Sequence, residues 1–411
     1  YPKELIGGLE LLSSEQTGVD FNNAIKESET VNHIYYSQIY NGAGVAIGDI
    51  NNDGLADVFF CGNQVEDKLY LNKGNFKFED ISKTSKITRS PGWSWGVTMA
   101  DVNNDGYLDI YVSRNGDSMT PSDRTNKLFI NNKDLTFTES AKEYGLADTG
   151  FSSQAVFFDM DNDGDLDVYQ VNQLPDSRLF SRYINIPEKR YKQYTDKLYI
   201  NQNGSYINIS KQAGLSEQYT YGLSVSASDL NNDGLTDLYV ANDYDEPDFM
   251  YYNNGDGTFT NVINSKLKHI SRFSMGSDTG DVNNDGNIDL ITLDMAAEDH
   301  YRSKTNMKSM NPIEFKQMID KGDHYQYMFN TLQINNGFGE FSDIANIAGI
   351  GKTDWSWGGL LVDLDNDGFK DIIISNGIKK DIRNNDFLNG LRVKLKTDSQ
   401  EFYEMAKLAP S

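Results

Sequence analysis

The sequence predicts an all-β protein: a β-propeller of four-stranded antiparallel blades. An acidic, glycine-containing motif recurs six times, beginning at residues 49, 101, 159, 229, 281 and 363. Each copy leads into a short run of β-branched and aromatic residues, which is typical of a strand. A unit of a few short strands that repeats along the chain indicates propeller blades, because one blade cannot bury both of its faces alone.

The motif is nine residues long, as in Asp49–Asp57. Oxygen-bearing side chains stand at positions 1, 3, 5 and 9, and glycine at position 6 permits the positive φ of a tight loop. Ca²⁺ takes six to eight oxygen ligands in a flexible geometry, so carboxylates and amides at alternate positions suit it. A backbone carbonyl at position 7 would complete the shell, and we expect about six Ca²⁺ ions, one in each loop. The predicted metal ligands, loop by loop, are Asp49, Asn51, Asp53, Leu55 and Asp57; Asp101, Asn103, Asp105, Tyr107 and Asp109; Asp159, Asp161, Asp163, Asp165 and Asp167; Asp229, Asn231, Asp233, Leu235 and Asp237; Asp281, Asn283, Asp285, Asn287 and Asp289; and Asp363, Asp365, Asp367, Phe369 and Asp371.

The second half of the loop differs from that of an EF-hand. An EF-hand has glutamate at position 12 and continues into a helix. Here the last acid is at position 9 and a strand-like run follows, as in Asp57–Phe60 and Asp109–Val112. The loops therefore join one strand to the next. A single turn of this composition could be an ordinary turn, but six copies with one ligand spacing favour metal binding.

The strands of each repeat follow one order. An entry strand of alternating small and large residues precedes the metal loop, as at residues 44–48 and 94–100, and the second strand follows the loop. A third strand, Lys68–Asn72 in the first repeat, leads through a turn to a fourth, as at Asn75–Ile81. The alternation of small and large side chains suits an inner strand that is packed between two neighbouring blades.

The repeats differ in length because some carry insertions. Successive motifs are 52, 58, 70, 52 and 82 residues apart. Antiparallel strands put the metal loops and the third-to-fourth turns on one face of the ring and the second-to-third connections on the other. The long insertions all fall in second-to-third connections: Asn115–Asn126, Asn172–Asp196, Asp294–Phe329 and the tail after Asn376. We expect these loops to form the binding surface, because binding residues commonly lie on loops over a rigid scaffold.

Three segments are expected along the chain. Residues 1–42 precede the first repeat, and the strand-like stretch 17–25 is placed to complete the last blade and close the ring. Residues 43–375 form the propeller. Residues 376–411 look partly helical and are either an insertion or the start of a continuing chain, because the sixth repeat has no clear third and fourth strands. We favour continuation, with a seventh blade beyond residue 411.

Acidic residues dominate the charge. The chain has 61 acidic and 37 basic residues and a net charge of −24. Twenty of the acids stand at motif positions 1, 3, 5 and 9, so six bound Ca²⁺ would bring the net charge near −12. The acidity thus reflects metal ligation more than a surface for a basic partner, and the lack of a basic stripe argues against nucleic acid binding. No run approaches the ~20 apolar residues of a transmembrane helix, and the single cysteine, Cys61, leaves no internal disulfide.

The long insertions also hold the candidate ligand-binding side chains. These are His300, Tyr301, His324, Tyr325, Tyr191 and Tyr194. A carboxylate–histidine pair could serve acid–base chemistry, and a solvated, partly helical loop is the alternative. No catalytic residue is assigned, because the four histidines share no ligand spacing and neither a His-Glu-x-x-His motif nor a Gly-x-Ser-x-Gly elbow occurs. The tryptophan pairs of Trp93–Trp95 and Trp355–Trp357 could be sugar platforms, but their period-2 spacing on inner strands favours packing between blades.

With these loops the sequence resembles the FG-GAP/VCBS repeat proteins, whose repeats carry an Asp-x-Asn-x-Asp-Gly-x-x-Asp calcium loop on a seven-bladed propeller like the integrin α-subunit head. Trp93–Gly96, Thr353–Gly358, Leu293–Asp299 and Tyr325–Gly337 are similar to large VCBS-repeat proteins of Bacteroidetes, which often continue into an ASPIC/UnbV-type domain. The resemblance covers nearly the whole chain. It implies an exported, extracellular or cell-surface protein, such as a lipoprotein near an outer-membrane transport complex. It supplies no activity, because propellers host many functions.

The sequence therefore favours a calcium-stabilised extracellular β-propeller that serves as a binding or scaffold module for a glycan or protein partner at the cell surface. Loops with calcium affinities of roughly 10⁻⁴–10⁻³ M fill only where calcium is abundant, which favours export. Two alternatives stay open. One is a calcium-dependent polysaccharide lyase or hydrolase with its site among the long inserts, and the other is a structural subunit of an envelope assembly.

Overall fold

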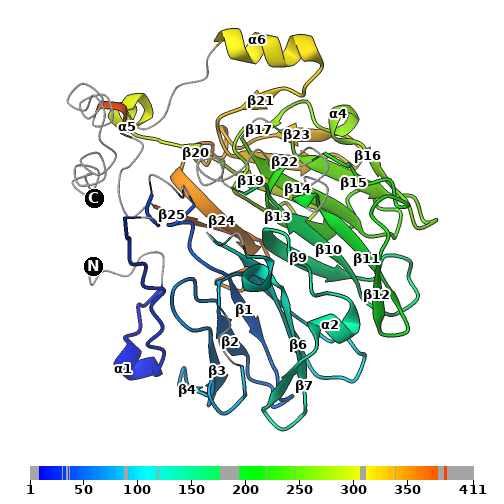
Figure 1. Ribbon diagram of the computed structural model, residues 1–411. Helices are drawn as coiled ribbons and strands as arrows, with labels where there is room; N and C mark the ends of the chain where they lie inside the picture. Colours follow the sequence, from blue (N-terminus) through cyan, green and yellow to red (C-terminus); the bar gives the residue numbers. More distant parts are fainter. Residues whose placement is uncertain are drawn as a thin grey trace.

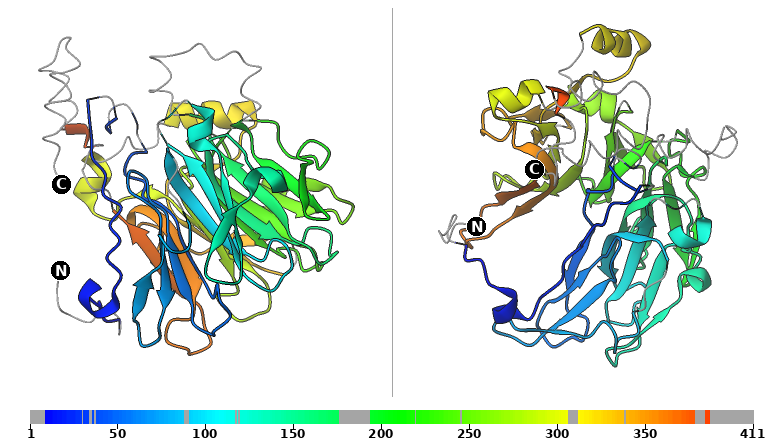
Figure 2. Two further views of the ribbon diagram at one scale, coloured as in Figure 1. Left: turned by 60° about the horizontal axis from the view of Figure 1, so that its bottom comes forward. Right: turned by 60° about the vertical axis from the view of Figure 1, so that its left-hand side comes forward.

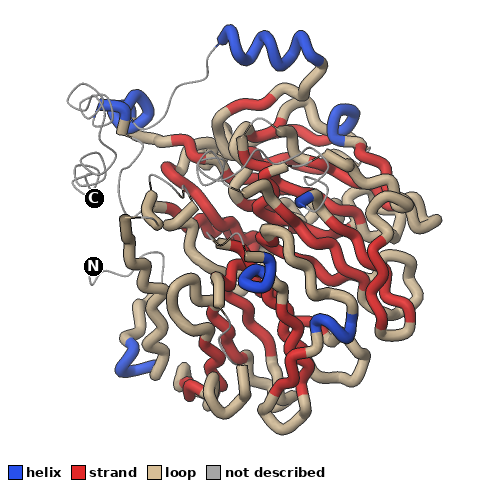
Figure 3. Tube along the Cα trace, viewed as in Figure 1, coloured by secondary structure: helices blue, strands red, loops and turns tan. Residues whose placement is uncertain are grey.

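The computed structural model describes residues 9–386, apart from residues 30, 34, 35, 37, 88–90, 117, 119, 176–193, 219, 245, 306–311, 338 and 378–383. Within this part of the chain, small antiparallel sheets stand side by side as the six blades of a β-propeller (Figure 1). Strands dominate the trace and helices are confined to connections (Figure 3). The predicted fold class is confirmed, and each metal loop joins the first strand of a blade to the second.

Five blades are four-stranded meanders in which each strand pairs with the next. Their strands are β1 (Val45–Gly48), β2 (Asp57–Phe60), β3 (Lys68–Asn72) and β4 (Phe78–Asp80); β5 (Trp93–Ala100), β6 (Asp109–Asn115), β7 (Lys127–Asn131) and β8 (Phe137–Glu139); β9 (Ser152–Phe158), β10 (Asp167–Asn172), β11 (Lys197–Gln202) and β12 (Ser205–Asn208); β13 (Tyr221–Ser228), β14 (Asp237–Asp243), β15 (Phe249–Asn253) and β16 (Phe259–Asn261); and β18 (Gly276–Gly280), β19 (Asp289–Leu293), β22 (Thr331–Asn335) and β23 (Phe341–Asp343).

The sixth blade is smaller in the described residues. It consists of β24 (Asp354–Val362) and β25 (Asp371–Asn376), and the two-residue β20 (Met295–Ala296) pairs with β24. A short parallel pair, β17 (Ile270–Ser271) with β21 (Gln326–Tyr327), ties the long insertion of the fifth blade to the segment before that blade. The helical segments are α1 (Ser14–Thr17), the 3₁₀ turn η1 (Pro121–Arg124), α2 (Ala141–Tyr144), α4 (Ile263–Lys266), α5 (His300–Thr305) and α6 (Pro312–Lys321). Among the described helices, none is both long enough and apolar enough to span a membrane.

The position-9 aspartate sets the register of every blade. It opens the second strand and pairs with the last residue of the first, as Asp57 does with Gly48 and Asp109 with Ala100. Since side chains alternate between the faces of a strand, the residue two places further on points towards the following blade. In the first five blades this residue is at most 1% exposed: Phe59, Tyr111, Tyr169, Tyr239 and Ile291.

The hydrophobic cores therefore lie between blades. Phe59 packs with Ile110 and Val112 of the next blade, and Tyr111 packs with Val168 of the blade after that. Full burial of one such side chain stabilises the fold by about 1.5–3 kcal/mol. Each blade thus depends on its neighbours for its stability.

The two ends of the array of blades each leave an apolar face uncovered. The first strands are neighbours in the order β1, β5, β9, β13, β18 and β24, and no comparable packing joins β24 back to β1 in the described residues. Val45 and Ile47 on β1 are 54% and 67% exposed, and Leu360 and Ile373 of the sixth blade are 56% and 36% exposed. Figure 2 (right) shows these blades, in blue and orange-brown, at the two ends of the array. The seventh blade expected from the sequence stays a prediction.

The N-terminal segment lies along the first blade. Thr17 is the last residue of α1, and residues 18–25 form no strand. Phe21 stacks on Phe60 with ring centroids 5.0 Å apart, and the Tyr70 hydroxyl donates a hydrogen bond to Asp20 at 2.7 Å. The ring-closing role of this stretch stays a prediction.

The same segment buries the first tryptophan pair. Tyr36 and Ile39 pack against Trp93 and Trp95, and the rings of Tyr36 and Trp93 meet edge to face at 5.4 Å. Both tryptophans are less than 10% exposed. They are core residues, as expected, but they pack against the N-terminal segment as well as within the ring, and they offer no open platform for a sugar.

Candidate functional site

The six acidic loops share one backbone conformation. The asparagine at position 4 has a positive φ of 55–62° in every copy, and the glycine at position 6 has a φ of 84–91°. Asparagine tolerates this left-handed region better than other side chains, and glycine adopts it freely. The two residues together bend the chain into the same tight loop in every copy.

The carboxylate at position 1 organises the loop. Asp49 accepts hydrogen bonds from the backbone N–H groups of Asp53 at 3.2 Å and Gly54 at 2.7 Å. The five other loops repeat both bonds, at 2.7–3.1 Å. Although burial acts to raise it, these amide donors hold the pKa of Asp49 below its usual value.

The carboxylate at position 9 is buried at the base of the loop. Asp109 accepts from the N–H of Val102, at position 2, at 3.0 Å and from the N–H of Asn131, at the end of the third strand, at 2.8 Å. The same pair of bonds recurs in the first, third, fourth and fifth loops. Burial raises the pKa to about 6 for Asp109 and Asp167 and to about 7 for Asp237. A nearby cation would favour the charged form of these groups.

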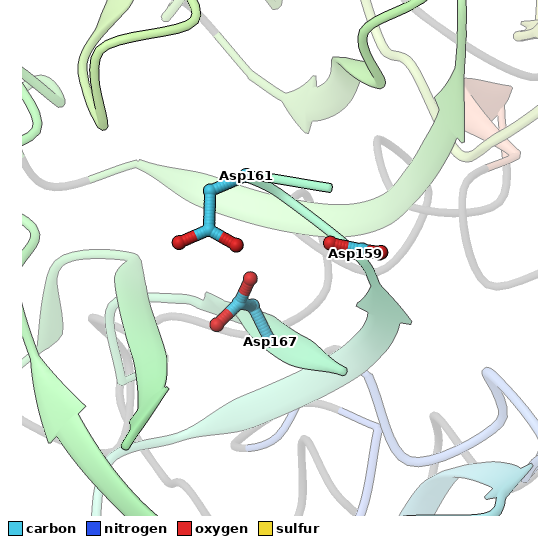
Figure 4. Close-up of side chains that lie close together, drawn as sticks. All are labelled: Asp159, Asp161 and Asp167. Atoms are coloured by element: carbon cyan, nitrogen blue, oxygen red, sulfur yellow. The ribbon is translucent and has the colours of Figure 1, made fainter. Parts of the chain in front are cut away.

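Carboxylates converge most closely in the third and sixth loops. One oxygen each of Asp159, Asp161 and Asp167 lies within 4.8 Å of the others, and Figure 4 shows the three groups turned towards a common centre. Asp363, Asp365 and Asp371 make the same arrangement. Position 3 is acidic in these two loops and asparagine in the other four. The two clusters could hold a metal ion, and their all-oxygen donor set fits a hard cation such as Ca²⁺.

A second repeated feature stands at the opposite ends of the strands and was missed in the sequence. The residue directly before the third strand accepts a hydrogen bond from the backbone N–H near the end of the second strand, at 2.7–2.8 Å in each of the first five blades. These residues are Asp67, Asn126, Asp196, Asp248 and Asn330. They hold the two ends of each second-to-third connection together, so each insertion is anchored where it leaves the blade. An aspartate or asparagine before each Lys-Leu-Tyr-like strand was the available signal.

We call the surface formed by the second-to-third connections the insert face. The candidate residues on it do not form one site. Tyr301 on α5 is 63% exposed, and α5 is anchored to the sixth blade because Arg302 donates to both carboxylate oxygens of Asp354, at 2.8 and 3.0 Å. His324 is 8% exposed, and burial and the nearby His269 lower its pKa. Figure 1 shows α5, which begins with His300 and Tyr301, apart from β21, which follows His324 and Tyr325.

The remaining candidates are also separate. Tyr325 is 46% exposed and lies beside Phe315, with ring centroids 6.2 Å apart. Tyr194 is 4% exposed and packs on Phe151 at 5.5 Å, so it is a core residue. Tyr191 lies outside the described residues. His300 and His324 therefore belong to separate parts of the insert face, and the carboxylate–histidine pair considered for an enzyme stays a hypothesis.

Five of the six acidic loops lie within matches to one family model. The family model described as an FG-GAP-like repeat matches residues 49–112, 117–169 and 229–292. Each match ends in the second strand of a blade, directly after an acidic loop. The chain contains FG-GAP-like repeats. The resemblance seen in the sequence is thereby confirmed for the repeats.

Individual relatives of these FG-GAP-like repeats are distant. The chain is 22% identical to cartilage acidic protein 1 of Xenopus tropicalis over 377 residues, which are 81% of this chain and 57% of that protein. It is 33% identical to integrin alpha-PS5 of Drosophila melanogaster over 95 residues, 20% of this chain and 9% of the integrin. An Agrocybe aegerita lectin that recognises terminal N-acetylglucosamine aligns at 16% identity over 72% of this chain and 64% of the lectin, with a TM-score of 0.37. The chain spans little more than half the length of the curated relatives that it matches along most of its own length.

Proposed function

We propose that this protein is an extracellular, calcium-stabilised β-propeller that binds a glycan or protein partner. The observation that carries the proposal is the sixfold repetition of one loop, in which the same carboxylates accept the same backbone hydrogen bonds. Calcium would neutralise charge and make the framework rigid on the face that carries the acidic loops and the third-to-fourth turns, which we call the loop face. Recognition would take place on the insert face, whose connections vary in length while their bases stay fixed.

The donor set supports calcium over other metals. Positions 1, 3, 5 and 9 carry only carboxylate and amide oxygens, without histidine or cysteine, and zinc prefers nitrogen and sulfur ligands. Burial and the neighbouring charge of Asp163 raise the pKa of Asp161, and a bound cation would favour its charged form. Asp159, Asp161, Asp163 and Asp167 would hold the ion of the third loop. The backbone carbonyl of Asp165 would add a further oxygen.

The extracellular location and the partner rest on different support. Similarity to cartilage acidic protein 1 and to a segment of an integrin alpha chain favours a protein outside the cell, where calcium is abundant. Attachment to the outer membrane as a lipoprotein, beside a transport complex, is the finer form of this proposal and rests on the family resemblance of the sequence alone. We favour a binding role over catalysis because the sequence has neither a His-Glu-x-x-His motif nor a Gly-x-Ser-x-Gly elbow.

The experiment that tests the proposal compares aromatic side chains on the two faces. Immobilised protein is screened against a glycan array and against secreted and surface proteins, with calcium and with EDTA. We expect a ligand whose binding is weakened at least fivefold by Tyr301→Ala on the insert face. The matched control is Phe76→Ala, since Phe76 is 70% exposed in a third-to-fourth turn on the loop face.

Three outcomes would contradict the proposal. Equal losses in the two variants would argue against the insert face as the binding surface. Binding that is unchanged in EDTA would remove the role of calcium. Reproducible cleavage of a polysaccharide would replace the binding role with an enzymatic one.

A further inference from the structure

The asparagine at position 4 of one loop reaches the next loop of the ring. Asn52 donates from Nδ2 to the carbonyl of Gly106 at 2.8 Å, and Asn104 donates to the carbonyl of Gly164 at 3.2 Å. Asn284 donates to the carbonyl of Gly368 at 2.9 Å. In each case the acceptor is the position-6 glycine of the following loop. Position 4 is not one of the predicted ligand positions, so these side chains are free for this second task.

The links divide the six loops into two groups. Asn232 joins the fourth loop to the fifth through the side-chain oxygen of Asn287, at 2.7 Å. Asn162 makes no hydrogen bond to the fourth loop in the described structure, although all six loops are described. The first three loops are therefore linked in series, and so are the last three, with a break between the third and the fourth.

Three of the four links, those to Gly106, Gly164 and Gly368, hold a peptide unit that is next to predicted metal ligands. The carbonyl of Gly106 accepts from Asn52, and the N–H of the same peptide unit, that of Tyr107, donates to Asp105 at 3.0 Å. The third and sixth loops repeat this N–H bond, at 3.0 and 2.8 Å. The peptide between positions 6 and 7 is thus fixed at both ends. It connects the position-5 carboxylate with the position-7 carbonyl, and both are predicted ligands.

Little else restrains this peptide from outside. An added Cβ at Gly106, Gly164 or Gly368 would have no neighbouring atom within 4 Å. Glycine is also the residue with the greatest backbone freedom. The hydrogen bond from the preceding loop therefore adds an anchor from outside the loop to the bonds that Asp101 and Asp105 make within it.

We propose that the position-4 asparagines couple the metal loops, so that an ion bound in one loop raises the affinity of the next loop in the same group of three. The proposal rests on calcium binding by the loops and adds the regulation of that binding. An ion that orders one loop fixes its position-4 side chain and, through it, the peptide of the next loop. A loop that is already ordered pays less conformational entropy when it binds its own ion. The coupling is reciprocal, as thermodynamic linkage requires.

The test uses two substitutions of one kind. Asn104→Gly removes the link to the third loop, and Asn162→Gly removes a side chain that makes no such link. Glycine accepts the positive φ at both positions, 55° and 58°, so neither variant strains the backbone. Hydrogen exchange of peptides that cover residues 101–109, 159–167 and 229–237 is followed by mass spectrometry while free calcium is raised from zero, which gives a binding midpoint for each of these loops.

We expect Asn104→Gly to raise the calcium midpoint of the third loop about three- to tenfold, the factor that one hydrogen bond contributes. It should also speed exchange of that loop without calcium. Asn162→Gly should leave the fourth-loop midpoint within twofold of the wild type. In a second arm, Asp53→Ala, which disables the first loop, should raise the second-loop midpoint in the wild type but have little effect in an Asn52→Gly background.

Equal midpoints in the wild type and Asn104→Gly would overturn the coupling and leave calcium binding intact. A similar shift at the fourth loop in Asn162→Gly would also overturn it, because that loop receives no link. If calcium protects none of the loops, calcium binding itself fails. The two failures are therefore distinguishable.

Discussion

At the scale of single residues, repeated polar side chains divide into those that face the loop and those that close a connection. Asp196 and Asp248 belong to the second kind, Asp294 follows the second strand of the fifth blade and donates its N–H to Asn330, and all three are buried. Burial raises the pKa of Asp196 and Asp294 to about 6 and that of Asp248 to about 7. These groups are not predicted metal ligands. Their effect on the pH dependence of stability therefore comes from folding and not from metal binding.

The substitution Asp248→Asn should change how stability depends on pH. Asp248 accepts from the backbone of Asn242 and from the hydroxyls of Tyr239 and Ser274. Its folded-state pKa lies above the unfolded value of about 4, so the folded protein holds the proton more tightly. The contribution of this group is therefore full below pH ~4 and is lost as the pH rises through about 7, at no more than about 1.4 kcal/mol per pH unit.

The variant should lose less stability than the wild type between pH 5 and pH 8. Urea unfolding of both proteins in saturating calcium measures this difference. Asparagine already occupies the equivalent place at Asn126 and Asn330, so the variant should fold. Parallel stability curves for the two proteins would show that Asp248 does not titrate in this range.

At the scale of elements, the asparagine at the end of the third strand connects the second, fourth and fifth blades to the blade before them. Asn131 donates to the carbonyl of Ile50 in the preceding loop at 2.8 Å, and Asn335 donates to the carbonyl of Leu230 at 2.9 Å. These bonds complement the apolar packing between blades. The first blade has no described blade before it, and its Asn72 donates within its own loop, to Ala56.

This contrast gives a matched pair of variants. Asn253→Ala should lower the free energy of unfolding by about 1–3 kcal/mol, because it leaves the buried carbonyl of Met160 without the donor that now lies at 2.8 Å. Asn72→Ala should cost less than about 1 kcal/mol, since its bond is local and partly exposed. Urea unfolding in calcium measures both values. Equal losses would mean that the bond between blades contributes nothing beyond the local turn.

At the scale of the whole molecule, an excess of negative charge and shared blade faces make stability a property of the array. The net charge is −24, and much of it is concentrated in the loops. When the free calcium concentration is a hundred times the dissociation constant of a site, one independent site adds about 2.7 kcal/mol to the free energy of unfolding. Six sites in one array will not add simply, because neighbouring blades share their cores.

Removal of calcium should therefore lower the melting temperature by more than about 10 °C. Native mass spectrometry should count about six ions, and Asp159→Ala should lose one of them. The control is Asp256→Ala, which changes an acid that holds Thr258 in a third-to-fourth turn. A shift of only a few degrees with EDTA, or an unchanged ion count in Asp159→Ala, would count against a structural role for the loops.

The architecture and the candidate metal residues could be predicted from the amino-acid sequence. Both depend on local patterns: a nine-residue spacing of oxygen ligands, a glycine at position 6 and a strand after position 9. Such patterns act within one turn or one strand, so they can be read without knowing which segments meet. The number of repeats then implied blades that pack on one another.

Only the tertiary structure decided which distant residues meet. It showed that Asn52 reaches Gly106, that Tyr36 covers Trp93, and that α5, which begins at His300, lies apart from β21, which follows His324 (Figure 1). These contacts depend on how blades and connections are placed in space, and residue spacing along the chain carries no information about that placement. Packing between blades fixed it, because each blade buries its faces only against its neighbours.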